Sequence, residues 1–158
     1  MTKADVQKVL AFAKHQFLSM DTSLLDNDAN ERSITHKFAE YMRVTIDDIF
    51  EGEELSVDCE YNRYGRHSKE IERIEEIVGL TESTSCLSPK TVYPDIIVHK
   101  RGLAGPNWIV IEAKKDPSDR ETNTDIDKLK KIKRLYNYNF ALFLIFDTDS
   151  KDISWEFI

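Results

Sequence analysis

The residues from Phe140 to Asp147 are almost all apolar, and this run constrains the fold more than any other feature of the sequence. It is far too short to cross a bilayer, but it has the length of a β-strand. A strand without alternating polar residues is typical of a sheet that is buried on both faces. The chain must then supply helices on both sides of that sheet, so the sequence predicts an α/β fold.

The composition favours a globular protein over a disordered chain. The sequence has 158 residues, of which 41% are hydrophobic and 32% are charged. This length matches one hydrophobic core, so a single domain is expected over residues 1–158. Residues 1–8 carry charges where a secretory signal needs an apolar stretch, so we expect a cytoplasmic location without membrane association. The two cysteines, Cys59 and Cys86, show no zinc-ligand or disulfide pattern and are expected to be free thiols.

Apolar residues recur at helical spacing in three segments. The first covers residues 2–20, and the second begins at a cap, Asp28 or Asn30, and continues to about Met42. The third covers residues 124–137. In each segment the apolar residues lie three or four positions apart, which predicts amphipathic helices.

Further strands are predicted where β-branched and aromatic residues gather between turn residues. These strands cover residues 55–64, 91–99 and 108–115, and a final edge strand covers residues 153–158. Residues 66–90 carry no comparable pattern and are expected to form a connecting excursion.

The segment between strands 91–99 and 108–115 contains two glycines and a proline, which favours an antiparallel hairpin. The helix at 124–137 then acts as a crossover, which makes strands 108–115 and 140–147 parallel. The predicted product is a mixed sheet flanked by helices.

The hairpin places chemistry-bearing residues together. Residues two apart on a strand share a face, so Glu112 and Lys114 are expected on one face with Trp108 and Val110. A further residue, Asp95, comes opposite Glu112 if the hairpin is symmetric about its loop. Directly opposed Cβ atoms lie about 4.5–5.5 Å apart, so the two carboxylates would be close neighbours.

The same symmetric register pairs His99 with Trp108. His99 is then expected either to border the two carboxylates or to lie on the surface. Two other acidic residues, Asp58 and Glu60, share one face of a predicted strand. A solvated face is expected for them, and the alternative is that they approach a bound metal ion.

Two neighbouring carboxylates repel each other unless a cation or a proton lies beside them. Oxygen ligands suit Mg²⁺ or Mn²⁺. Asp95 and Glu112 could hold such an ion while Lys114 orients an attacking water or stabilises developing charge. This arrangement predicts metal-assisted hydrolysis of a phosphodiester. The alternative is that Glu112 and Lys114 form an ordinary ion pair on a solvated strand.

A family resemblance follows from these residues. Pro94-Asp95, sixteen intervening residues and Glu112-Ala113-Lys114 resemble the motif of the PD-(D/E)xK nuclease superfamily. Two further segments, 30–34 and 57–63, are similar to a group of small, mostly uncharacterised bacterial proteins of that superfamily. The resemblance extends from about Asp28 to Thr148 and leaves out residues 66–90 and both termini.

The resemblance implies a restriction-endonuclease-like αβββαβ core, in which Asp95 and Glu112 bind Mg²⁺ (or Mn²⁺). The Ala113 carbonyl could add a ligand, and Lys114 would be the catalytic lysine. The helix acid of the family corresponds to Glu31, which would shape the site or a second metal position. A carboxylate in the first turn of a helix is also stabilised by the helix dipole, so Glu31 has a structural explanation too.

Basic residues cluster on the predicted helix after Lys114. Lys128 and Lys131, one turn apart, could contact phosphates, whereas the default explanation is a solvated helix face. The net charge of −7 disfavours non-specific nucleic-acid binding, so such contacts require a focused site.

The expected function is a metal-dependent nuclease that acts on nucleic acid, with DNA favoured as the polymer. A homodimer is compatible with the fold, although no segment specifies an interface. One alternative is a catalytically idle module of the same fold that binds nucleic acid or protein. Another is a phosphohydrolase that acts on a nucleotide or a small phosphoester.

Overall fold

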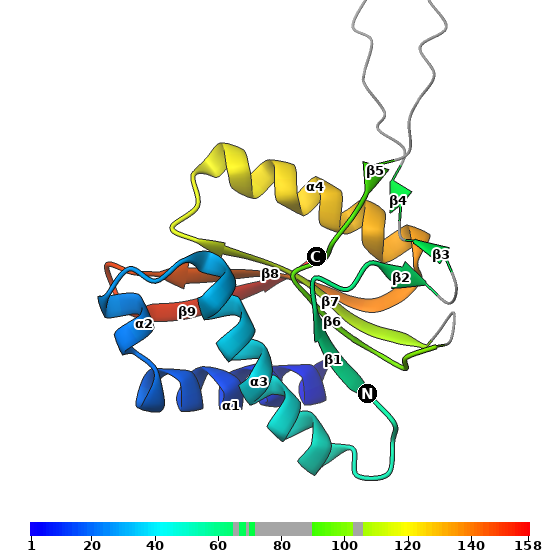
Figure 1. Ribbon diagram of the computed structural model, residues 1–158, viewed down its shortest axis with the longest axis horizontal. Coiled ribbons are helices and arrows are strands. Elements are labelled where there is room, and N and C mark those ends of the chain that lie inside the picture. Colours follow the sequence, from blue (N-terminus) through cyan, green and yellow to red (C-terminus); the bar gives the residue numbers. More distant parts are fainter. Residues whose placement is uncertain (65–66, 69, 72–89, 103–105) are drawn as a thin grey trace, which may run out of the picture.

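The computed structural model describes residues 1–64, 67–68, 70–71, 90–102 and 106–158. Within these residues, the chain forms a five-stranded mixed sheet with helices on both faces (Figure 1). The strand order is β1 (Ser56–Cys59), β6 (Ile96–His99), β7 (Asn107–Lys115), β8 (Tyr138–Asp147) and β9 (Asp152–Phe157). The antiparallel pairing of β6 with β7 and the parallel pairing of β7 with β8 confirm the predicted hairpin and crossover. The pairs β1–β6 and β8–β9 are also antiparallel.

The helices form a layer on each side of the sheet. Figure 1 places α1 (Lys3–Met20), α2 (Ser23–Asp26) and α3 (Glu31–Ile49) on one side and α4 (Asp119–Leu135) on the other. Two small antiparallel ladders lie outside the main sheet: β2 (Arg63–Tyr64) with β3 (His67–Ser68), and β4 (Glu70–Ile71) with β5 (Lys90–Thr91). In the described part of the chain, none of the helices is long and apolar enough to cross a membrane.

The sheet separates two hydrophobic cores, and β8 contributes to both. Leu142, Leu144 and Phe146 lie in the first core, with α1 and α3. The intervening Ala141 and Phe143 lie in the second core, with α4. This alternation explains why the strand is apolar throughout, and it confirms that β8 is buried on both faces.

Several element boundaries differ from prediction because caps and tertiary packing determine them. Helix α4 begins at Asp119, earlier than predicted, since Ser118 and Glu121 form a capping box before the apolar stripe starts. Helix α3 is capped by Asn30 and continues to Ile49, past the predicted end, because Ile46 is also buried. The short helix α2 was not predicted.

Strands β1 and β6 are both shorter than predicted. Strand β1 ends at Cys59 because Glu60 has a positive φ of 51°. Strand β6 begins at Ile96 rather than residue 91, directly after Pro94 and Asp95. Most of the predicted excursion at 66–90, including Cys86, lies outside the described residues.

The predicted hairpin register holds from Ile96, which pairs with Ile111, to Val98, which pairs with Ile109. It then shifts, so His99 pairs with Asn107 and its predicted pairing with Trp108 is wrong. The shift comes from a β-bulge, which inserts one residue into a strand and changes the direction of the next side chains. Trp108 accordingly packs against the first core, not beside Val110 in the second.

Phe146 is a suitable test of the first core. Its ring lies 6.1 Å from that of Phe17 and 5.8 Å from that of Phe38, centroid to centroid, and the side chain is fully buried. We expect Phe146→Ala to lower the free energy of unfolding by about 3–5 kcal/mol, measured by urea titration, because a cavity forms. Phe12→Ala, at an exposed residue of α1, is the control and should cost less than about 1 kcal/mol. Equal losses for the two variants would contradict the assignment of the core.

Candidate active site

The three motif residues, Asp95, Glu112 and Lys114, meet just before β6 begins, opposite the part of β7 that extends beyond the β6–β7 pairing. Strand β6 begins at Ile96, opposite Ile111, so continuing the register by one residue places Asp95 opposite Glu112. The Asp95 carboxylate accepts a hydrogen bond from the Ala113 N–H over 2.8 Å. The Asp95 side chain therefore satisfies the backbone donor of Ala113 next to the β6–β7 pairing. This hydrogen bond holds the Asp95 carboxylate beside Glu112.

Glu112 is buried, with 3% of its surface exposed. Its Oε1 accepts a hydrogen bond from Lys128 Nζ over 2.6 Å, and its Oε2 is buried without a hydrogen-bond partner among the described residues. Burial, together with the charge of Asp95, raises the pKa of Glu112 to about 7, although Lys128 acts in the opposite direction. The positive charge around this carboxylate is therefore too small to offset the free-energy cost of keeping it ionised.

The pKa of Asp95 is also raised, and burial is the main cause. The hydrogen bond from Ala113 and the positive charge of Lys114 oppose this rise. Both carboxylates of the motif are therefore held in surroundings that favour a nearby cation.

Lys114 lies between helices α3 and α4. Its Nζ is 3.3 Å from Glu31 Oε1 and 3.8 Å from Asp125 Oδ2. Burial lowers the pKa of Lys114, but the carboxylates of Glu31 and Asp125 outweigh it, and the net shift is upward. The structure thus keeps a charged ammonium beside the carboxylate pair.

Glu31 joins the start of α3 to the end of β7. One of its carboxylate oxygens contacts Lys114, and the other accepts a hydrogen bond from the Lys115 backbone N–H over 2.9 Å. Glu31 also occupies the first turn of α3. Glu31 therefore both occupies the helix start and contacts the site residue Lys114.

Helix α4 contributes two site residues. Lys128 was predicted on this helix as a phosphate contact, and the structure places it on Glu112. Asp125, which we did not predict, lies one turn earlier and faces Lys114. Their separation of three residues, with the buried Leu129 beside them, was a signal that both face the sheet. Lys131 makes no hydrogen bond or ion pair with any residue that the structure describes.

A second charged cluster joins β1 to β6. Asp58 Oδ2 lies 2.8 Å from His99 Nε2 and 2.9 Å from Arg101 Nε, and Arg101 Nη2 also bonds Asp58. Asp58 and His99 are buried, so the prediction of a solvated face for Asp58 is wrong. His99 lies at the opposite end of β6 from Asp95 and does not border the carboxylate pair. Glu60 is exposed, as expected, and pairs with Arg32.

Asp95, Glu112 and the Ala113 carbonyl, the predicted ligands, could supply only oxygen donors, the kind that suit Mg²⁺ or Mn²⁺. Within the described ranges, no group of three or more His, Cys, Asp or Glu side chains is arranged to hold a metal ion. Water and substrate oxygens would therefore complete the coordination, as is usual for Mg²⁺. The buried, unpartnered Oε2 of Glu112 fits this interpretation, because a cation would supply its missing partner.

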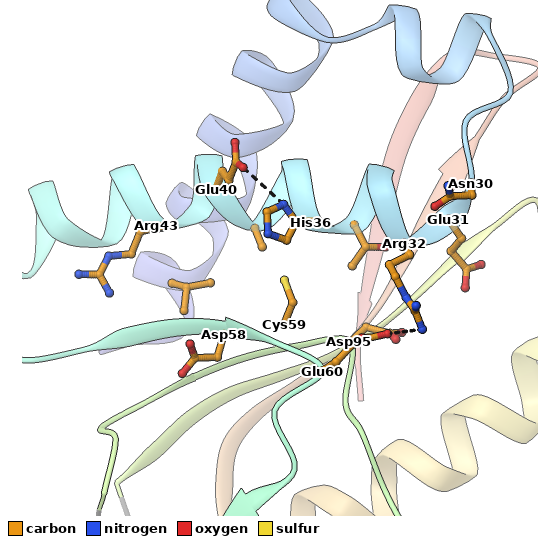
Figure 2. A pocket seen from close by; sticks show the side chains of 13 residues that line it. Asn30, Glu31, Arg32, His36, Glu40, Arg43, Asp58, Cys59, Glu60 and Asp95 are labelled. Carbon is orange, nitrogen blue, oxygen red and sulfur yellow. Dashed lines mark ion pairs between the residues drawn. The ribbon is translucent and has the colours of Figure 1, made fainter.

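A groove of about 1020 Å³ lies between α3 and β1 (Figure 2). Figure 2 shows Glu31 and Asp95 near the end where α3 begins, and Arg43 toward the other end. The Cys59 thiol, which is free, lies between them, and burial raises its pKa to about 11. The full lining consists of Asn30, Glu31, Arg32, Thr35, His36, Ala39, Glu40, Arg43, Val57, Asp58, Cys59, Glu60 and Asp95.

No protein-family model, curated protein or solved structure matches this chain.

The raised pKa of Glu112 predicts a specific pH dependence of stability in EDTA. The folded value of about 7 exceeds the ordinary value of 4.5, so the folded state binds an extra proton between them. The stability that Glu112 contributes should therefore decrease as the pH rises from 4.5 through 7, by about 3 kcal/mol.

Glu112→Gln removes this titration. The free energy of unfolding of Glu112→Gln, measured by urea titration at several pH values, should increase relative to that of the wild type as the pH rises from 4.5 through 7. Glu53→Gln, at an exposed residue, should follow the wild type. Parallel profiles for Glu112→Gln and wild type would contradict the burial of an uncompensated carboxylate.

Proposed function

We propose that this protein is a metal-dependent nuclease that hydrolyses phosphodiester bonds of nucleic acid, with DNA as the first candidate polymer. The observation that carries the proposal is the carboxylate pair of half-buried Asp95 and buried Glu112, with a charged Lys114 beside it and an unpartnered oxygen on Glu112. A protein that only binds a partner has no evident need for this combination.

The order of elements supports a restriction-endonuclease-like core. In chain order, α3, β1, β6, β7, α4 and β8 give the sequence αβββαβ. The first three of these strands are antiparallel neighbours, and the last is parallel to β7 after the α4 crossover. In this assignment, α1, α2, β9 and the short strands β2–β5 are additions to the core.

Each site residue has a role in the proposed reaction. Asp95 and Glu112, with the Ala113 carbonyl, would hold the divalent ion, which when bound polarises the phosphate and lowers the pKa of a water ligand. Lys114 would hold its positive charge close to the attacked phosphate and orient the attacking water. Glu31 positions Lys114 from one side and Asp125 from the other.

Lys128 has a separate role in this account. Its ammonium neutralises part of the charge of Glu112 through Oε1 and leaves Oε2 unpaired. Lys128 therefore keeps the metal ligand in a fixed orientation, and a bound phosphate would also meet its positive charge.

The test is cleavage by wild type and Lys114→Ala of plasmid, linear duplex, single-stranded DNA and RNA, with Mg²⁺ or Mn²⁺ and with EDTA. Wild type should cut at least one polymer, and only with metal. Lys114→Ala should cut at least about 10²-fold more slowly, because a preorganised charge is lost at the transition state.

Lys130→Ala, at an exposed residue of the same helix as Asp125, removes the same charge and should cut like wild type. Circular dichroism must show that both variants are folded. Metal-dependent cleavage that persists in a folded Lys114→Ala would contradict the assigned role. If the wild type cleaves none of the polymers, the result would favour the catalytically idle binding module.

A further inference from the structure

The α3–β1 groove extends away from the proposed catalytic residues. Glu31 and Asp95 line it at the end where α3 begins, and Arg32, His36 and Arg43 follow along the same helix (Figure 2). An occupant of the groove would therefore lie next to a phosphodiester bound at Asp95. The groove is a candidate for the part of the substrate that adjoins the cleaved bond.

The charges along the groove are largely paired. Arg32 lies 2.8 Å from Glu60, His36 lies 3.4 Å from Glu40, and Arg43 lies 2.8 Å from Asp47. Binding of a phosphate backbone depends on lysines and arginines that are free to neutralise it. In the ranges that the structure describes, the groove offers no such unpaired cation, so a polyanion track is a poor fit.

The remaining surface of the groove fits a flat, uncharged ring. Ala39, Val57 and Cys59 contribute apolar surface, and Thr35 contributes a hydroxyl. The volume of about 1020 Å³ is at the upper end of the usual range for small-molecule sites. Two planar side chains lie at its rim, and both are well exposed: the Arg32 side chain by 80% and that of His36 by 65%. Planar arginine and aromatic side chains are the groups on which unpaired bases stack.

We infer that the α3–β1 groove binds an unpaired nucleobase of the strand whose phosphodiester lies at Asp95. This inference rests on the proposed nuclease function and narrows it to substrates that are single-stranded next to the cleaved bond. A base within a continuous duplex is stacked and paired, so it reaches the groove only at the cost of unpairing.

The test is a binding measurement in EDTA, so that it does not depend on cleavage. A short fluorescein-labelled DNA strand, alone or annealed to its complement, is titrated with protein and followed by fluorescence anisotropy. The single strand should bind at least about tenfold more tightly than the duplex. Duplex binding that equals or exceeds single-strand binding would overturn the inference.

Two variants test the groove itself. His36→Ala removes a stacking surface, and Cys59→Phe fills the space; each should weaken single-strand binding about fivefold or more. His36→Phe keeps a flat ring and should bind like wild type. His15→Ala, at an exposed histidine of α1 outside the groove, is the matched control and should also bind like wild type.

If Cys59→Phe does not fold, the variants His36→Ala and His36→Phe still test the inference. The exposed His36 side chain can be replaced without disturbing a core. Equal single-strand binding by His36→Ala and wild type would overturn the inference. The nuclease proposal fails through a different result, the absence of metal-dependent cleavage of any polymer, so the two failures are distinguishable.

Discussion

The hydrogen bond from the Ala113 N–H to the Asp95 carboxylate is the interaction on which the site depends. Strand β6 begins only at Ile96, so the Ala113 N–H lies beyond the β6–β7 ladder. The Asp95 side chain supplies the acceptor that this N–H needs. A backbone requirement of the sheet thus places a carboxylate opposite Glu112, and the motif spacing reflects the geometry of a hairpin.

A buried carboxylate beside a half-buried one is costly in free energy, and side chains from the surrounding helices offset part of that cost. Helix α4 contributes Lys128 to Glu112, and Lys114 is held by Glu31 and Asp125 from the two helical layers. The compensation is incomplete, since one oxygen of Glu112 remains unpartnered among the described residues and its pKa is raised. Incomplete compensation of this kind is common at functional sites, and it supports the proposed metal site.

The features that local pattern determines could be predicted from the sequence. The apolar run of β8 indicated a doubly covered sheet, and the glycines and proline before β7 indicated the hairpin that aligns Asp95 with Glu112. The bulge at His99 could not be predicted, because a single inserted residue leaves no periodic signal. The partners of Asp58 and Lys128 were also missed, because they lie 41 to 43 and 16 positions away and depend on how the elements pack.

Diffraction from a crystal grown with Mn²⁺, recorded near the manganese absorption edge, tests the central claim most directly. The account predicts an anomalous peak within ligand distance of an Asp95 oxygen and of Glu112 Oε2. No peak should appear at this position in a crystal of Asp95→Asn grown in the same way. A wild-type crystal with manganese bound only elsewhere, or with none at this carboxylate pair, would contradict the metal-dependent site.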